Sequence, residues 1–263
     1  MRTAAVVVAS LALVVAGCGG SESAARRELR ETAQRLSQIR SGNLTLRLLV
    51  TSTTGKRSRI GFQLRGPFEL RPNALPLAHI EYTQYAGTRS ATATFVSTGT
   101  QAYALVNGKR VAIPASAAAQ IQGAASGLGV GGGGGGLRID SWLENPSVSD
   151  GGVVGGASTD HISARLDVVN AANGLLTLVR SLGHAAPTIS GSAADQLRKA
   201  VKSSSIDVWT GKQDKLLRRL ELKAQLGFDV PKELRRALGS LVGANVEFEL
   251  AVSSPNRPVH VKP

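Results

Sequence analysis

From Asn43 onward, apolar and polar residues alternate with a period of two over many short segments, and this alternation restricts the fold more than any other feature. It is clearest in residues 44–50, 216–226 and 246–252. Period two sends successive side chains to opposite faces, so each segment predicts a strand with one buried face. Asn107-Gly108, between two such segments, is a strong hairpin signal. Because no strand–helix–strand repeat of the parallel kind is visible, we expect antiparallel pairing.

Helical spacing of apolar residues separates these strands into two runs. We expect nine or ten strands, with helices at the start, between the runs and before the last strand. The expected helices are 24–40, 114–122, 170–182, 187–202 and 231–242. The polar stretch after Asn145-Pro146 is expected to be irregular, with a strand following at 161–169. This order predicts an α+β fold, a curved antiparallel sheet with helices on its concave face.

A glycine-rich stretch, 123–136, interrupts the pattern and contains six consecutive glycines. It formally matches the G-x-G-x-x-G pattern at Gly127, Gly129 and Gly132. A dinucleotide site requires that pattern between a strand and a helix of a βαβ unit, and no such unit is visible. We interpret the stretch as a loop within a single domain, residues 24–263.

The first residues have the features of an export signal. Met1-Arg2-Thr3 is followed by an apolar run too short to span a bilayer comfortably, and then by Gly17-Cys18. Val15-Ala16-Gly17-Cys18 resembles the bacterial lipobox, in which the cysteine is acylated, for example with palmitate, and the preceding bond is cut. Residues 1–17 are therefore predicted to be a lipoprotein signal peptide and 18–23 an acylated tether. The predicted location is the extracytoplasmic face of the cell membrane.

The chain is strongly basic, with a formal net charge of +13 and 4% aromatic residues. Basic residues are spread along the chain, and aromatic stacking platforms are scarce, so we expect no nucleic-acid partner. An anionic membrane surface is a better electrostatic partner. A basic face that is simply solvated is the alternative. Arg26, Arg27 and Arg30 lie closest to the predicted anchor.

No catalytic constellation is recognised, so we expect a protein that is not an enzyme and has no metal or cofactor. The four histidines are dispersed, without the spacing of a metal site. No G-x-S-x-G motif occurs, and Cys18, the only cysteine, is assigned to the anchor. The Gly-Lys pairs lack the Ser or Thr that a phosphate-binding loop requires.

Four segments in order resemble the LppX/LprAFG family of actinobacterial lipoproteins, whose fold is similar to that of the carriers LolA and LolB. They are 139–146, 159–166, 206–220 (with Ile206-Asp207-Val208-Trp209-Thr210-Gly211 the most characteristic) and 252–261. Where the family often has glycine, this chain has Ala164. The resemblance implies a LolA-like half-barrel sheet wrapped over helices and enclosing an apolar cavity. In the family, that cavity takes up acyl chains of lipids or glycolipids for transport through the envelope.

Two functions are left open by these observations. In the first, the chain binds or carries lipid or glycolipid and exchanges it with an envelope transporter. Its cavity would be lined by one face of the strands: Leu46, Leu48, Phe62, Leu64, Ile80, Tyr82, Leu220, Leu222, Phe248 and Leu250. The same residues could equally be core packed beneath the helices. In the second, the chain is an adaptor that docks on another envelope component through its basic surface.

Overall fold

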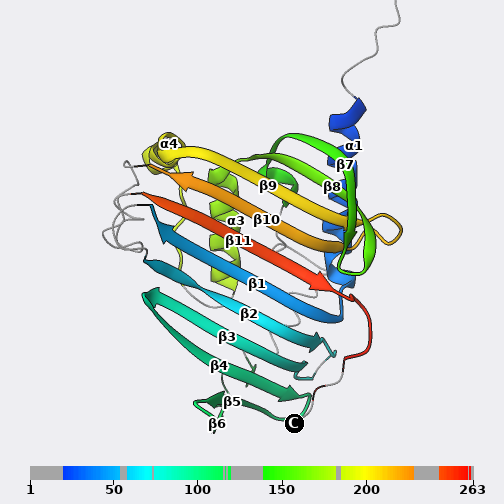
Figure 1. Cartoon of the computed structure of the whole chain (residues 1–263), viewed down its shortest axis with the longest axis vertical. Helices are drawn as coiled ribbons and strands as arrows, with labels where there is room; N and C mark the ends of the chain where they lie inside the picture. Colours follow the sequence, from blue (N-terminus) through cyan, green and yellow to red (C-terminus); the bar gives the residue numbers. More distant parts are fainter. Residues whose placement is uncertain are drawn as a thin grey trace, which may run out of the picture.

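A single antiparallel sheet of eleven strands forms the body of the chain, in the order β6-β5-β4-β3-β2-β1-β11-β10-β9-β8-β7 (Figure 1). The computed structural model describes residues 20–53, 58–72, 74–114, 116, 118–119, 139–181, 185–227, 243–259 and 261. The strands are β1 (Ser41–Ser52), β2 (Arg59–Glu69), β3 (Leu77–Gly87), β4 (Arg89–Thr98), β5 (Ala102–Val106), β6 (Lys109–Ala112), β7 (Leu143–Val154), β8 (Ala157–Leu166), β9 (Val201–Gly211), β10 (Leu217–Leu226) and β11 (Ala244–Ser253). The predicted α+β class and curved antiparallel sheet are confirmed.

The two runs of strands meet in the centre of the sheet. β1 pairs with β2 on one side and with β11 on the other, so the first and last strands of the chain lie next to each other. Each run otherwise pairs in sequence order, as hairpins do. The sheet is thus complete only when both ends of the chain are in place.

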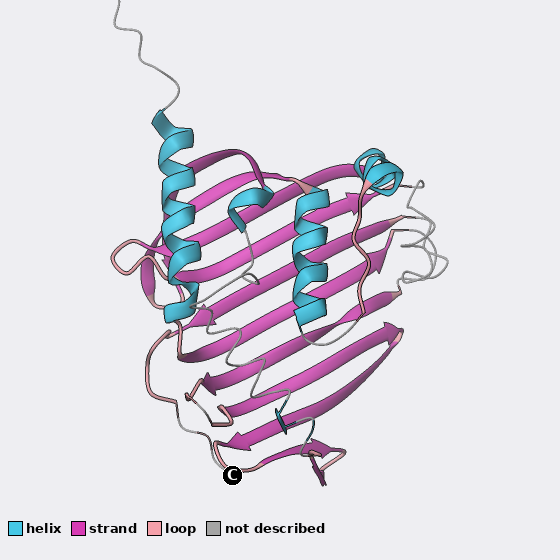
Figure 2. Cartoon of the chain, turned by 180° about the vertical axis from the view of Figure 1, so that it is seen from behind, coloured by secondary structure: helices cyan, strands magenta, loops and turns pink. Residues whose placement is uncertain are grey.

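The described helices lie on one face of the sheet, here named the helix face; the opposite face is named the outer face. They are α1 (Gly20–Arg35), η1 (Leu36–Gln38), η2 (Ile139–Trp142), α3 (Val168–Ser181) and α4 (Gly191–Ala200). Figure 2 shows α1, η2 and α3 over the half of the sheet that contains β7–β11, and they do not extend over β4–β6. Among the described residues, no helix combines the length and apolar character needed to cross a membrane.

The main hydrophobic core lies between these helices and strands β7–β11. From α1, Ala25 and Leu29 are buried at helical spacing in the same core as Leu220 and Phe248 of the sheet. Trp142 of η2 is 1% exposed and belongs to the same core. Burial of a side chain of this size contributes about 2 to 3 kcal/mol, so α1 and η2 are integral parts of the fold.

Three sequence expectations need correction. β7 occupies the stretch after Asn145-Pro146 that was expected to be irregular; its two register shifts and exposed positions hide the alternation. The strand expected at 161–169 ends at Leu166, because Asp167 accepts hydrogen bonds from the amides of Val169 and Asn170 and starts α3 there.

The third correction concerns the helix expected over 187–202, which is shorter. α4 begins at Gly191 and ends at Ala200, and Val201 opens β9 in the extended conformation. α1 begins at Gly20, within the range 18–23 that the sequence indicated as a tether. Cys18, the glycine-rich stretch 123–136 and the helix expected at 231–242 lie outside the described residues, as does nearly all of the expected helix 114–122.

Candidate functional site

One row of side chains crosses all eleven strands on the helix face. Cross-strand pairing joins the row residue by residue: Val148, Ile162, Val208, Leu220, Leu250, Leu46, Leu64, Tyr82, Ala93, Val106 and Lys109. Paired residues of an antiparallel sheet project to the same side. Ten of the eleven positions in this row therefore form one continuous apolar band from β7 to β5, and Lys109 of β6 ends it.

Burial along this row changes from one side of the sheet to the other. Ile162, Val208 and Leu220 are fully buried beneath the helices. Leu64 and Tyr82 are only half-buried, and Val106 is 40% exposed. The apolar band is therefore fully covered only at β8–β10, is half-buried at β7 and from β11 to β4, and is exposed at β5.

The ten residues predicted to line a cavity fall into three groups along this gradient. Leu220, Leu222 and Phe248 are buried members of the main core, and Leu46, Leu48 and Leu250 pack against that core while staying partly exposed. The remaining four, from β2 and β3, belong to neither of the two packed clusters of described residues: Phe62, Leu64 and Tyr82 are half-buried, and Ile80 is buried at 9% exposure. The sheet places all ten on one face.

We name the last four residues, together with Phe95, the apolar patch. Ile80 pairs with Phe95, and Leu64 pairs with Tyr82, so the five side chains adjoin one another across β2, β3 and β4. The rings of Phe62 and Tyr82 stack with their centroids 6.5 Å apart. Phe95 was not predicted from the sequence. Its place beside Ile80 follows from the pairing of β3 with β4, which the local alternation of residues does not reveal.

The helix face of β2–β5 carries no carboxylate among the described strand residues. Its polar positions are few, such as Gln84 and Ser97. Sites that hold apolar ligands are mainly hydrophobic and aromatic, with a small number of polar groups. The apolar patch therefore has the composition of a surface that binds hydrocarbon.

The outer face has a different composition, because charged residues pair there across β1, β9, β10 and β11. Glu221 and Glu249 lie opposite each other, and Arg47 lies 3.2 Å from Glu249. A hydrogen bond from Lys223 to Glu221, together with the charge of Glu221, raises the pKa of Lys223. This part of the outer face is thus a ladder of ion pairs, in which the side chains of Glu221 and Glu249 are mostly buried.

Two grooves lie on this outer face. One, of about 380 Å³, is bordered by Ser203–Ser205 and by parts of β10 and β11; the other, of about 240 Å³, lies among Arg47, Arg219 and the surrounding acids. Leu222 and Phe248 are the only members of the predicted cavity set that border either groove. Most residues that line the two grooves are polar or charged, unlike those of the apolar patch. The predicted apolar cavity stays a prediction, since 120–138 and 228–242 lie outside the described residues.

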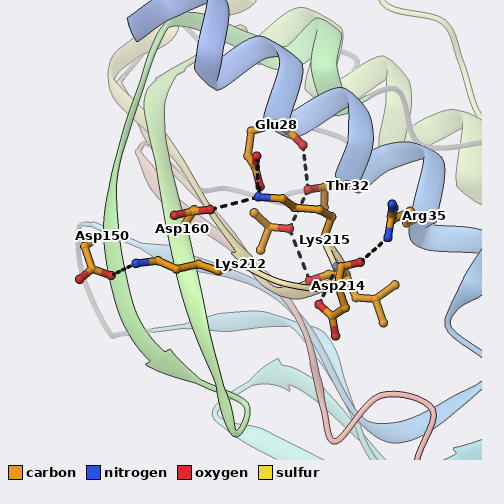
Figure 3. A network of polar contacts seen from close by, with 10 residues as sticks. Glu28, Thr32, Arg35, Asp150, Asp160, Lys212, Asp214 and Lys215 are labelled. Atoms are coloured by element: carbon orange, nitrogen blue, oxygen red, sulfur yellow. Dashed lines mark hydrogen bonds and ion pairs between the residues drawn. The ribbon is translucent and has the colours of Figure 1, made fainter.

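A network of polar contacts attaches α1 to β8 and to the turn between β9 and β10 (Figure 3). Lys215, in the β9–β10 turn, reaches Glu28 of α1 at 2.7 Å and Asp160 of β8 at 3.3 Å. Burial alone would lower the pKa of Lys215, but its hydrogen bonds and ion pairs with Glu28 and Asp160 outweigh burial and raise it. The hydroxyls of Thr32 and Thr210, both fully buried, lie 2.7 Å apart in the same network.

Arg218 of β10 also contacts this turn, and its side chain is buried, with 4% exposed. Its guanidinium donates to Asp214 at 2.5 Å and to the carbonyl oxygen of Leu216 at 3.2 Å. Arg35 of α1 donates to the carbonyl oxygen of Asp214 at 2.9 Å. The N-terminal helix is therefore bound to the turn by side chains that sequence reasoning did not select.

Side chains of the types that act in catalysis or metal binding are dispersed among the described residues. His161 lies 2.9 Å from Asp207 and stacks on Trp209, with ring centroids 4.6 Å apart. Within the described ranges, no group of three or more His, Cys, Asp or Glu side chains is placed to hold a metal ion. The expectation that the chain is not an enzyme stays a prediction.

Comparison with solved structures shows a similarity of fold. No family model matches the sequence, and no curated protein matches it. The crystal structure of LprF from Mycobacterium bovis aligns with 93% of this chain and 99% of its own, with a TM-score of 0.50 and 15% sequence identity. The chain thus has an LprF-like fold, and the fold implied by the resemblance to the LppX/LprAFG family is confirmed.

Proposed function

We propose that this chain, which shares its fold with LprF, is a membrane-anchored extracytoplasmic lipoprotein that binds the acyl chains of lipid or glycolipid against the helix face of its sheet. The proposal includes the acyl anchor on Cys18, and it is one of binding without catalysis. Its ligands would be exchanged with a membrane or with a transporter of the envelope.

The observation that supports it best is the change in burial along the apolar row. A packed core would bury the whole row, whereas Leu64 and Tyr82, which belong to the apolar patch, are half-buried and Val106 is exposed. Each buried methylene contributes about 0.8 kcal/mol. An acyl chain with ten methylenes on this face would gain roughly 8 kcal/mol before the entropic costs of binding.

The experiment is uptake of a fluorescent fatty-acyl lipid by two variants of adjacent residues. Leu64→Asp places a carboxylate on the helix face, inside the apolar patch. Gln63→Asp places the same group one residue away on the outer face of the same strand. We expect Leu64→Asp to weaken lipid binding at least tenfold and Gln63→Asp to leave it within about twofold of the unchanged protein.

Thermal unfolding of both variants checks that the fold is retained. Equal lipid binding by the two variants, with both folded, would remove the basis for the proposal. The adaptor interpretation would then be favoured, and the next step would be to look for an envelope component that binds the basic surface.

A further inference from the structure

The start of α1 and the whole of α4 lie at the same end of the molecule. Figures 1 and 2 share their vertical axis, the longest axis of the chain, and in both the first turn of α1, α4 and the first residues of β9 lie at the upper end. The β5–β6 hairpin lies at the lower end. Elements about 170 residues apart in sequence thus share one end of the molecule, on opposite sides of the sheet.

Both elements carry exposed cations, those of α1 in its second and third turns. Arg27 and Arg30 of α1, and Lys199 and Lys202 of α4 and β9, are all exposed. Within the described part of the chain, none of these four side chains has an ion-pair partner. We name these four residues the basic end.

Apart from Glu31, one helical turn after Arg27 on α1, the acidic side chains described close to the basic end are occupied by other partners. Asp195 of α4 pairs with Arg198 at 2.9 Å, and Glu144 of β7 pairs with Arg165. Asp167 accepts backbone hydrogen bonds at the start of α3, and Glu28 is engaged by Lys215. The charge of the basic end is therefore not neutralised by these neighbouring carboxylates.

The position of Cys18 indicates what the basic end faces. Only one residue separates Cys18 from Gly20, where α1 begins, and two residues of chain span at most about 7 Å. Arg27 follows Gly20 by about 10 Å of helix rise, close to the screening length of about 8 Å in physiological salt. Arg30 follows Gly20 by about 15 Å, nearly twice that length, so a lipid on Cys18 would hold Arg27 within electrostatic reach of the headgroups and Arg30 at its margin.

We propose that the basic end is a docking surface for anionic lipid headgroups, and that it holds the molecule upright on the bilayer with β2–β6 pointing away from the membrane. This orientation rests on the acyl anchor of the proposed function. The headgroup contact itself does not, and it is independent of whether the apolar patch holds an acyl chain. Four cations from two separate elements bind a plane more rigidly than a single basic helix does.

The first test measures binding of the full chain carrying Cys18→Ser to sedimented vesicles, so that no acyl group contributes. The docking variant is Arg27→Gln, Arg30→Gln, Lys199→Gln and Lys202→Gln. The matched control removes the same charge elsewhere, at the exposed residues Arg65, Arg89, Lys109 and Arg257. Vesicles contain phosphatidylcholine with or without phosphatidylglycerol, and circular dichroism verifies the fold.

We expect the docking variant to bind phosphatidylglycerol vesicles roughly a hundredfold more weakly than its Cys18→Ser parent, since each cation near an anionic surface is worth a factor of about three to five. The control variant should lose less than about fivefold. Equal losses in the two variants would mean that net charge alone acts, and this would overturn the proposal. No loss in the docking variant would overturn it as well.

The second test reports orientation in the acylated protein. Because Cys18 is the only cysteine, Gln196→Cys on α4 provides a single reactive thiol for a fluorophore, and Thr100→Cys provides one at the opposite end. In phosphatidylglycerol vesicles with a quencher on the lipid headgroups, we expect strong quenching at position 196 and little at 100. The reverse order, or equal quenching at both positions, would contradict the upright orientation.

Discussion

Lys215 Nζ lies 2.7 Å from a carboxylate oxygen of Glu28, a residue that precedes it by 187 positions in the chain. The pair joins the N-terminal helix to the β9–β10 turn, and Asp160 completes it from β8. Both side chains are mostly buried, so the loss of either partner leaves a poorly solvated charge. α1, which follows the predicted membrane anchor directly, is thus attached to the sheet by charge as well as by apolar packing.

Glu28→Gln should release α1 from the sheet more readily. We expect a loss of about 1 to 3 kcal/mol in the free energy of local opening, because Lys215 keeps its charge and loses one of its two carboxylates. Amide hydrogen exchange would measure it as reduced protection in α1, with β9 and β10 less affected. As control, Asp195→Asn breaks the exposed pair with Arg198 and should cost less than about 0.5 kcal/mol. Similar effects of the two substitutions would show that the Glu28–Lys215 pair does not hold the helix.

Asp214→Asn should make stability less dependent on acid pH. Burial raises the pKa of Asp214, but the hydrogen bond from Arg218 and the amide of Leu216 outweigh it and hold the pKa below its ordinary value of 3.8. A lowered folded pKa stabilises the protein above pH 3.8, and that contribution is lost as the pH falls through the folded pKa. The free energy of unfolding of the variant should be lower by about 2 kcal/mol near pH 7, since Arg218 is buried while Asp214 is partly exposed.

Urea unfolding at a series of pH values measures this difference. We expect the gap between the unchanged protein and Asp214→Asn to narrow below pH 3.8. A constant gap over the whole acid range would mean that ionisation of Asp214 does not stabilise the fold.

Gly174→Ala should destabilise the chain although alanine favours helices. A Cβ at position 174 of α3 would lie 2.4 Å from Cζ2 of Trp142, whose indole is buried in the core. Alanine gains about 1 kcal/mol in helix propensity over glycine, while overpacking of a core costs roughly 1 to 3 kcal/mol. We expect a net loss of about 1 kcal/mol or more in the free energy of unfolding. Trp142→Phe in the same chain should recover part of that loss, and strictly additive effects would contradict a direct clash.

Cys18→Ser tests the membrane anchor without reference to the fold. Without the thiol there is no site for acylation, so the protein should leave the membrane fraction or accumulate as uncut precursor. Membrane fractionation and mass measurement distinguish these outcomes from normal processing. A variant that is processed and still fractionates with the membrane would show that the lipobox interpretation is wrong.

Alternation of apolar residues was sufficient to predict most of the sheet from the sequence. Leu46, Leu48, Leu220 and Leu222 repeat with a period of two because each projects into the same interior. β7 was missed because it is an edge strand: Val148 is half-buried against the core, while Pro146 and the shifts near Asp150 break the repeat. Edge strands often carry bulges and polar residues that prevent pairing with other chains, so their sequences resemble loops.

The polar attachment of α1 could not be predicted in the same way. Glu28, Thr32 and Asp160 carry no local pattern, and their partners lie in a turn far away in sequence. The division of the predicted cavity residues was also not accessible, because Leu220 and Leu64 occupy equivalent places in the alternation. Only the position of α1, η2 and α3, over β7–β11 and not over β4–β6, makes one of them core and leaves the other half-buried.

Native mass spectrometry of the full-length protein, purified from the membranes of a bacterium that acylates lipoproteins, tests the central claim most directly. The account predicts a population that carries a lipid or glycolipid which dissociates on collisional activation, and a covalent acyl mass that remains on Cys18. The Leu64→Asp variant should lose the dissociable lipid and keep the covalent one. Protein that is free of dissociable lipid in repeated preparations, while still acylated on Cys18, would contradict lipid binding by the helix face.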